Sequence, residues 1–160
     1  MPVTIVPADL AEPLHAAAVV DLLDAYARDP MGGGRPLSDH ARRNLPHELD
    51  ARDNAVVLLA FEDTLPVGVL VAFEGFSTFA CKPLLNVHDI SVHPDHRGKG
   101  IARALLDAAE AEARKRGSCK LTLEVLSGNK RARAVYEAAG YRAYALDPAK
   151  GSALFLEKPL

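Results

Sequence analysis

Three apolar segments follow one another closely in the middle of the chain, and they constrain the fold more than any other feature. Ala55–Phe61 is a nearly continuous apolar run, typical of a strand covered on both faces. The turn Asp63-Thr64-Leu65-Pro66 separates it from Val67–Phe73, which is expected to be its hairpin partner. Leu84–Val92 is a third strand, which Pro94 ends. These segments predict one sheet.

Helical periodicity appears on both sides of this region, in four segments with apolar residues at helical spacing. They are Leu10–Tyr26, a segment from Ser38 or Asp39 to about Arg52, Gly100–Arg116 and Asn129–Ala139. Pro46 lies inside the second segment, and we expect it to kink or divide that helix. The loop Asp29–Pro36 holds three glycines between two prolines, which predicts a mobile connection.

Shorter strand-like segments complete the pattern. They are Val3–Val6, Leu121–Leu126, Tyr141–Leu146 and Ala153–Leu156. Strands and helices interspersed in this order predict an α/β fold, with a central mixed, twisted sheet of about six to seven strands flanked by about four helices. The chain has 160 residues and no linker or internal repeat, so residues 1–160 are expected to form a single domain.

Charge and composition exclude several classes of function. The net charge of −2 argues against a general nucleic-acid-binding protein, which usually carries a basic face. No window reaches the roughly 18 apolar residues that a membrane span requires, and the N-terminus does not resemble a signal peptide. Cys81 and Cys119 form no CxxC pair and are expected to be free thiols. We therefore expect a cytoplasmic protein with no membrane or nucleic-acid partner.

The segment Val92–Ala102 carries the clearest chemical signal. It runs from a strand through a turn into a helix start, and Gly98 and Gly100 let a ligand approach the backbone closely. The N–H groups at a helix start have no hydrogen-bond partners within the helix, and the helix dipole adds positive potential there. Both properties suit the binding of a pyrophosphate. Arg97 and Lys99 add cations beside them.

Two other phosphate-binding motifs do not fit this segment. It lacks the GxxxxGK[ST] pattern of a P-loop, and Arg103 stands where a dinucleotide-binding fingerprint needs its third glycine. A basic turn without a ligand remains an alternative on this segment alone. His93 and His96 flank Asp95, but they lie in the turn expected to hold phosphate, so no metal is predicted.

A second segment, Asn129–Tyr141, makes the pattern specific. Arg97-x-x-Gly100-x-Ala102, followed by Asn129, Tyr136 and Gly140-Tyr141 at this spacing, resembles the GNAT (GCN5-related N-acetyltransferase) superfamily. The resemblance covers about residues 55 to 146 and implies the GNAT fold and acetyl-CoA as the acyl-donor substrate.

The resemblance also implies roles for individual residues. Backbone groups of a strand that splays from its neighbour would bind the pantetheine arm, and the Val92 N–H would polarise the thioester carbonyl. Asn129 would contact the cofactor arm, and Tyr136 would act as the general acid toward the thiolate. The strand residues are Ile90, Ser91 and Val92. The residues expected to hold the pyrophosphate through their amides are Arg97, Gly98, Lys99, Gly100, Ile101 and Ala102.

The sequence indicates the residues that would bind the acceptor less specifically than those that would bind the cofactor. The segment from Gly75 to Val92 is similar to the diamine and polyamine acetyltransferase branch, but His88 replaces its glutamate while Asp89 matches. His88 or an ordered water would take the amine proton. Simple alternation places His88 on the face of Ile90 and Val92, and Asp89 and Ser91 on the other.

The acidic residues near the glycine-rich loop have two interpretations. Asp24, Asp29 and Asp39 are candidates to receive a cationic amine beneath a lid formed by that loop, with solvated surface charges as the alternative.

These observations together predict an N-acetyltransferase. We expect direct attack of the primary amine of a small molecule on acetyl-CoA in a ternary complex, with no metal. A protein or peptide N-acetyltransferase, and a catalytically silent acyl-CoA-binding regulatory module, are the alternatives. The resemblance also implies a homodimer.

Overall fold

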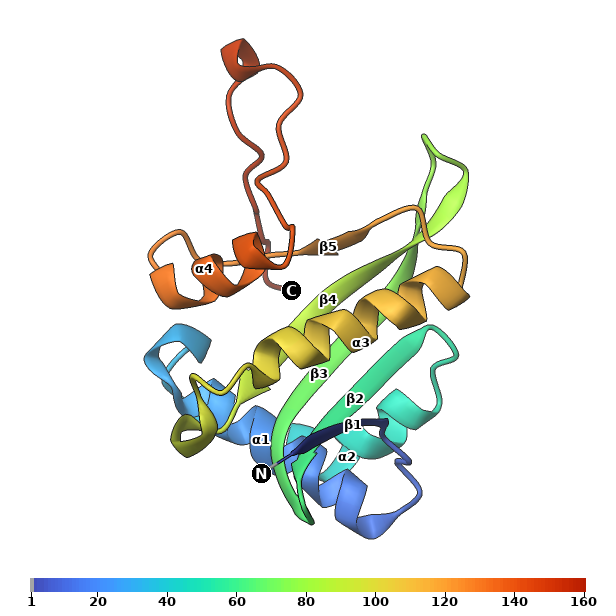
Figure 1. Ribbon diagram of the computed structural model, residues 1–160, viewed down its shortest axis with the longest axis vertical. Helices are drawn as coiled ribbons and strands as arrows, with labels where there is room; N and C mark the ends of the chain where they lie inside the picture. The colour runs from blue at the N-terminus through green and yellow to red at the C-terminus, as the bar shows by residue number, and fades with distance from the viewer. Residues whose placement is uncertain (1) are drawn as a thin grey trace.

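The computed structural model describes residues 2–160 and confirms the predicted α/β architecture, with helices on both faces of a twisted sheet (Figure 1). The strands are β1 (Val3–Pro7), β2 (Ala55–Glu62), β3 (Leu65–Ser77), β4 (Lys82–Val92) and β5 (Leu121–Leu123). The helices are α1 (Pro13–Arg28), α2 (Asp39–Asp50), α3 (Ile101–Lys115) and α4 (Lys130–Ala138), with short 3-10 turns η1 (Pro30–Gly32), η2 (Pro94–His96) and η3 (Pro148–Lys150).

The five strands form one mixed sheet in the order β1-β2-β3-β4-β5. β1, β2, β3 and β4 each run antiparallel to the next strand in this order. β5 runs parallel to β4. β2 and β3 are buried along most of their length, as their continuous apolar sequences require when helices cover both faces.

Each face of the sheet has its own apolar core. On one face α3 packs with Leu105 and Leu106 fully buried against Leu70 and Leu85. On the other face α1 contributes Val19 and its neighbours against β2 and β3. Helices thus cover both faces of the sheet, and β4 is the strand on which the candidate site is built.

Gly68 brings α3 close to the sheet. A Cβ at this position would lie 3.2 Å from both Ile101 Cγ2 and Leu105 Cδ1, which is tighter than ordinary van der Waals contact. The absence of a side chain therefore lets the first turn of α3 lie directly on β3.

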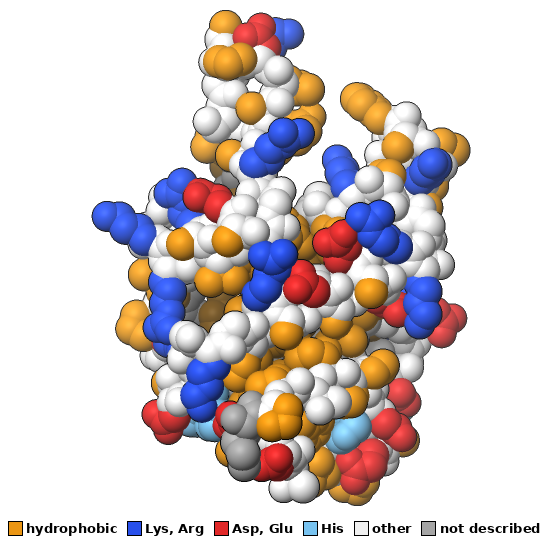
Figure 2. Space-filling view, in the orientation of Figure 1, with side chains coloured by type: hydrophobic (Ala, Val, Ile, Leu, Met, Phe, Trp, Pro, Cys, Tyr) orange, Lys and Arg blue, Asp and Glu red, His pale blue; other side chains and the backbone are white. Residues whose placement is uncertain are grey.

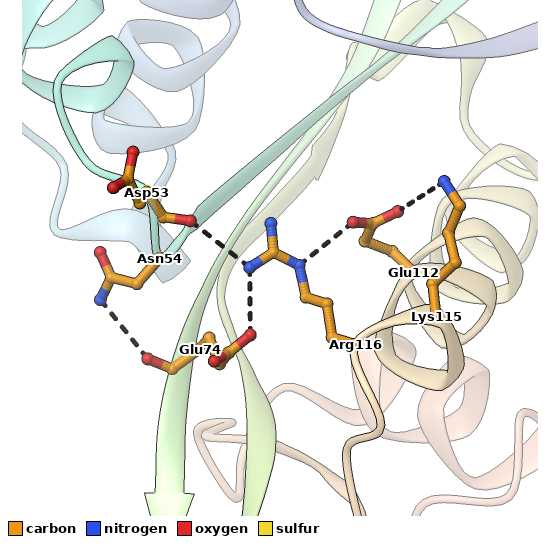
Figure 3. Close-up of polar contacts among 6 residues, drawn as sticks. All are labelled: Asp53, Asn54, Glu74, Glu112, Lys115 and Arg116. Atoms are coloured by element: carbon orange, nitrogen blue, oxygen red, sulfur yellow. Dashed lines mark hydrogen bonds and ion pairs between the residues drawn. The ribbon is translucent and has the colours of Figure 1, made fainter.

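A polar network fixes the other end of α3 (Figure 3). Arg116 donates from Nη1 to Glu74 Oε2 and from Nε to Glu112 Oε1, both at 3.1 Å, and it also reaches the carbonyl oxygen of Asp53 at 3.4 Å. Asn54 Nδ2 lies 3.4 Å from the carbonyl oxygen of Glu74. One guanidinium thus joins the helix end to β3 and to the segment before β2.

Some predicted elements differ from the structure. The segments 141–146 and 153–156 form no strands, so between residues 2 and 160 the sheet has five strands and not the expected six to seven. β5 ends at Leu123, because beyond that residue the chain leaves β4 and has no ladder partner. The proline prediction was also wrong in part: α2 continues through Pro46, since Leu49 beyond it is anchored in the core.

None of the helices between Pro2 and Leu160 combines the length and the apolar character that crossing a bilayer demands.

Candidate active site

The main cleft lies where the end of β4 meets the first turns of α3 and α4. Its volume is about 360 Å³. Ten of the residues predicted from the sequence line it. They are Ile90, Ser91, Val92, Arg97, Gly98, Gly100, Ile101, Ala102, Asn129 and Tyr136. Residues far apart in the chain are therefore brought to one cavity.

The cleft opens because β4 and β5 separate. They pair only from Leu85 to Val87, opposite Leu121–Leu123, so the last five residues of β4 face no strand on that side within residues 2–160. On the other side, the His93 N–H donates to Val67 O on β3 at 2.8 Å. Successive backbone groups alternate in direction, so the Val92 N–H points away from β3 and toward the cleft.

The start of α3 is built to hold an anion. Gly98 and Gly100 have φ of 76° and 79°, in the left-handed region that favours glycine. A Cβ on either would meet no atom within 4 Å, so open space lies beside this backbone. Gly100 is the N-cap and supplies no side-chain acceptor, which leaves the first N–H groups of α3 free for a ligand.

The cations near this turn are already engaged by acids. Lys99 directs its ammonium to Glu62, 3.4 Å away, and His96 Nδ1 lies 2.8 Å from the same carboxylate. Burial acts to raise the pKa of Glu62, but Lys99 and His96 outweigh it and hold that pKa below its usual value. Lys99 therefore anchors the turn to the end of β2 and does not line the main cleft.

Arg97 connects the turn to the glycine-rich loop. Its Nε donates to Val92 O at 3.1 Å, and its Nη2 lies 3.4 Å from Asp29 Oδ2. Asp29 in turn accepts from Met31 N at 2.9 Å through its other carboxylate oxygen. Arg97 thus positions the loop above the end of β4.

Two phenols, those of Tyr26 and Tyr136, line the main cleft. Burial, followed by the influence of Tyr26 and Tyr141, raises the pKa of Tyr136 to about 12. The Tyr136 hydroxyl therefore stays protonated at neutral pH and is able to donate a proton or a hydrogen bond. Asn129 lies in the same cleft, where its Oδ1 caps α4 by accepting from Ala132 N at 3.2 Å.

A side cavity of about 350 Å³ lies across β4, beneath α1 and α2. Most of its lining is apolar, from residues such as Leu37, Leu45 and Phe73, and it shares Tyr26 with the main cleft. β4 supplies two polar side chains to it, His88 and Asp89. His88 lies at the exposed edge, with its ring 5.5 Å from that of Phe73.

A β-bulge explains why His88 and Asp89 lie together. Val71 pairs with Asp89 while Ala72 pairs with Val87, which leaves His88 as an extra residue in β4. The predicted alternation was therefore wrong for His88, which does not share a face with Ile90 and Val92, because the bulge shifts the phase of the strand by one residue. It was right for Asp89 and Ser91, which lie on the face opposite Ile90 and Val92. His88 lines the side cavity with Asp89.

The acidic residues near the loop have separate places. Asp24 is buried and fully engaged: it pairs with Arg28 at 2.8 Å and Arg42 at 2.9 Å, and it accepts from Leu37 N at 2.9 Å. Its carboxylate therefore joins α1 to α2 and to the segment before α2, and it is not free to bind an amine. Asp39 lies exposed in the first turn of α2.

Asp89 differs from these acids. Among residues 2–160, no side chain or backbone N–H forms a hydrogen bond or ion pair with its carboxylate, although it is partly buried. Burial raises the pKa of Asp89, and the neighbouring His88 offsets part of that increase.

His93 and His96 stack edge to face, with ring centroids 5.7 Å apart. Within the part of the chain that the structure describes, no group of three or more His, Cys, Asp or Glu side chains is arranged to hold a metal ion.

Several cleft residues escaped the sequence reasoning. Tyr26 is the last residue of a predicted helix and precedes the glycine-rich loop. The sequence does not show that this loop lies close to β4, so it does not indicate that Tyr26 lines the cleft. Arg103 and Arg131 also line the cleft, and they lie in the first turns of α3 and α4. Basic residues beside a predicted anion site could have indicated them as cofactor-binding residues.

The fold and this cleft together define a class of protein, the acyl-CoA-dependent acetyltransferases. The model of the acetyltransferase (GNAT) family matches residues 19–141. The chain belongs to this family, and the prediction drawn from the two motifs is confirmed.

Individual relatives agree with this assignment. Streptothricin acetyltransferase from Streptomyces lavendulae is 42% identical over 82 residues, covering 51% of this chain and 43% of that protein. Ribosomal-protein-alanine N-acetyltransferase from Brucella melitensis biovar Abortus 2308 has a similar structure, with a TM-score of 0.67, 27% identity and coverage of 91% of this chain and 99% of that one.

The fold itself recurs at lower identity. A Bacillus halodurans C-125 protein described as a transcriptional regulator has a TM-score of 0.79 at 20% identity, over 99% of this chain and 100% of that one. The chain matches less than two thirds of the length of its first curated sequence relatives, at 43%, 58% and 38%.

Proposed function

We propose that this protein transfers the acetyl group of acetyl-CoA to the primary amine of a small molecule, within a ternary complex. One observation carries the proposal: the open edge of β4 in the main cleft and the unpaired Asp89 carboxylate in the side cavity lie on adjacent residues of one strand. An acyl donor and a cationic acceptor bound in these two places would meet at Tyr26.

Acetyl-CoA would occupy the main cleft. Its pyrophosphate would bind the free N–H groups from Arg97 to Ala102, with Arg131 as a nearby cation. Its pantetheine arm would run along Ile90, Ser91 and Val92, past Asn129.

The acceptor would enter the side cavity. Asp89 would bind its ammonium group, while the apolar lining would hold an apolar body. The curated relatives are named for streptothricin, mycothiol and ribosomal-protein alanine, so the family accommodates different acceptors. A partly enclosed cavity of about 350 Å³ favours a small molecule over a folded protein surface.

The chemistry follows from these positions. The ammonium loses a proton to His88, to Asp89 or to a water between them, since only the neutral amine is nucleophilic. The nitrogen then attacks the thioester carbon, and the Val92 N–H stabilises the oxyanion. As the C–S bond breaks, Tyr136 protonates or hydrogen-bonds the thiolate. The products are the amide, CoA thiol and one released proton.

A thiol-release assay with acetyl-CoA tests this proposal. We expect turnover with 2-phenylethylamine, weaker turnover with spermidine and none with a peptide that begins with alanine. Asp89→Asn should raise KM for the amine about tenfold, because it removes a charge-assisted hydrogen bond. Asp39→Asn is the matched control and should behave as the parent protein.

Two results would contradict the proposal. Acetylation of the peptide alone would favour a protein N-acetyltransferase. Binding of acetyl-CoA without turnover on any amine would favour a silent regulatory module.

We also propose a cytoplasmic homodimer. A reducing compartment that supplies acetyl-CoA suits two exposed, free cysteines, Cys81 and Cys119.

A further inference from the structure

Tyr26 lies where the main cleft and the side cavity meet. Of the described residues that line the two cavities, Tyr26 is the one that lines both. The strand β4 separates the cavities, because Ile90 and Val92 face the α3 side of the sheet while Asp89 faces the side cavity beneath α1 and α2. A molecule or chain that extends from one cavity into the other must therefore pass the Tyr26 side chain.

The outer edge of β4 is free at this point. Within residues 2–160, no strand pairs with that edge beyond Val87. Tyr26 belongs to the last turn of α1, and it lines the main cleft together with Met31 of the following loop. Figure 2 shows hydrophobic side chains at the floor of a hollow between α4 and this loop. An aromatic ring thus lies where the sheet itself provides no barrier between the cavities.

The loop after α1 holds Tyr26 in place. The Tyr26 carbonyl oxygen accepts from Asp29 N at 3.1 Å, and a Cβ at Gly32 would overlap with the same oxygen, so the loop packs directly on it. Arg97 in turn contacts Asp29 through Nη2 and Val92 O through Nε. The end of α1 that carries the ring is therefore anchored to the loop and, through Arg97, to the end of β4.

Carboxylates from both cavities act on the Tyr26 phenol. Burial first, then Asp89 in the side cavity and Asp29 in the main cleft, raises the pKa of Tyr26. Tyr26 in turn contributes to the raised pKa of Tyr136. The phenol is therefore neutral at pH 7 and lies within electrostatic range of groups in both cavities, as expected of a residue between them.

The position of Tyr26 matters for the acyl donor as well as for the amine. Under the proposed function, the thioester carbon lies beside Val92 in the main cleft, and the amine reaches this carbon from the side cavity. The acyl chain starts at the same carbon, so a long chain and the amine compete for the space beside the Tyr26 ring. The methyl group of acetyl needs little of that space. Each further methylene needs more apolar volume, which the side cavity offers through Leu37, Leu45 and Phe73.

We propose, on the basis of that function, that Tyr26 is the residue that restricts the acyl group to acetyl. Its ring leaves room at the junction for the amine beside a methyl group, but not beside a longer acyl chain. Loss of the ring would join the two cavities, of about 360 and 350 Å³, and a chain of several methylenes would then fit along the apolar lining while the amine still reaches Asp89. The hydroxyl is not needed for this role, because the ring supplies the bulk.

Steady-state kinetics with 2-phenylethylamine and two donors, acetyl-CoA and hexanoyl-CoA, test this role of Tyr26. We expect the parent protein to use acetyl-CoA with a kcat/KM at least about 100-fold higher than that for hexanoyl-CoA, and Tyr26→Ala to reduce this ratio at least about tenfold. Tyr26→Phe keeps the ring and should keep the parent's ratio. Tyr144→Ala, which removes an exposed ring outside both cavities, is the matched control. A general loss of activity lowers both rates, so the ratio reports acyl selectivity alone.

A binding measurement on the unmodified protein gives a second test that does not depend on a variant's folding. N,N-dimethyl-2-phenylethylamine keeps the cation and the aromatic body, but its tertiary nitrogen cannot form an amide. Calorimetry should show that this amine binds the acetyl-CoA complex at least about tenfold more tightly than the hexanoyl-CoA complex. Equal binding to the two complexes, or an unchanged donor ratio in Tyr26→Ala, would overturn the role of Tyr26 while turnover with acetyl-CoA still supports the proposed function. No turnover with acetyl-CoA on any amine would overturn both.

Discussion

Arg97 and Asp29 join two parts of the site that lie 68 residues apart in the chain, with Nη2 and Oδ2 separated by 3.4 Å. The same guanidinium donates to Val92 O, so the glycine-rich loop is tied to the strand end that we propose binds the thioester. This contact holds the loop beside the end of β4, although its glycines permit movement.

Asp29→Asn should loosen the loop while it keeps the cap on Met31 N. The ion pair is partly exposed, so we expect it to contribute up to about 1 kcal/mol, which corresponds to a roughly fivefold rise in KM for the amine. Asp29→Ala should also lower Tm, because it removes the cap as well. Steady-state kinetics and thermal unfolding of the two variants separate these effects. Equal KM values for both variants and the parent protein would show that the contact does not position the loop.

Tyr136→Phe should lower kcat by about 100-fold or more, with little change in acetyl-CoA affinity, since only the proton donor is lost. The pKa of Tyr136 is raised to about 12, so its proton is retained at pH values where an ordinary tyrosine already ionises. The rate should therefore rise up to about pH 10 as the amine becomes neutral. A pH–rate profile that falls between pH 8 and 10 in the parent protein, but not in Tyr136→Phe, would contradict this assignment.

Arg116→Met should destabilise the fold by about 1–3 kcal/mol, because it leaves Glu74 and Glu112 without their shared partner. Arg114→Met, two residues earlier, removes only an exposed pair with Glu110 and should cost less than about 0.5 kcal/mol. Urea denaturation measures both free energies of unfolding. Similar losses in the two variants would mean that the network in Figure 3 adds nothing beyond a surface ion pair.

Asp24 should make the free energy of unfolding depend on pH in the acidic range. Its hydrogen bond from Arg28, then that from Leu37 N, lowers its pKa from 3.8 to about 2. A carboxylate with a lowered pKa in the folded state stabilises the protein above about pH 4, and this contribution is lost as the pH falls toward 2. Asp24→Asn should lower the urea midpoint at pH 7 and reduce its change between pH 4 and 2. Asp21→Asn, on the exposed side of α1, should keep the parent's dependence.

The elements that the sequence predicted best are those with long, uninterrupted patterns of apolar residues. β2 and β4 agree with prediction within a few residues, and α3 within one, because their apolar residues are buried by neighbours within the same chain. The pyrophosphate turn was predictable for a similar reason, since glycines and a helix start act locally.

The errors have a common physical origin, which is that they depend on pairing and not on local pattern. The bulge at His88 is decided by the register between β3 and β4, so alternation alone assigned His88 to the wrong face. The segments 141–146 and 153–156 do have strand patterns, but within residues 2–160 they pair with no other strand, and a strand forms only when it pairs. The side cavity depends on how α2 packs against α1 and β2, and this could not be predicted from the spacing of residues.

Calorimetric titration with acetyl-CoA tests the central claim most directly, using the parent protein, Ala102→Asp and Ala111→Asp. Asp in the first turn of α3 suits the helix dipole, so Ala102→Asp should fold, but its carboxylate would occupy the anion site. Ala111 lies on the exposed face of the same helix and provides the matched control.

We predict one acetyl-CoA bound per chain in the parent protein and in Ala111→Asp, and affinity at least about tenfold lower in Ala102→Asp. No binding by the parent protein, or equal binding by all three proteins, would contradict the assignment of the main cleft to acetyl-CoA.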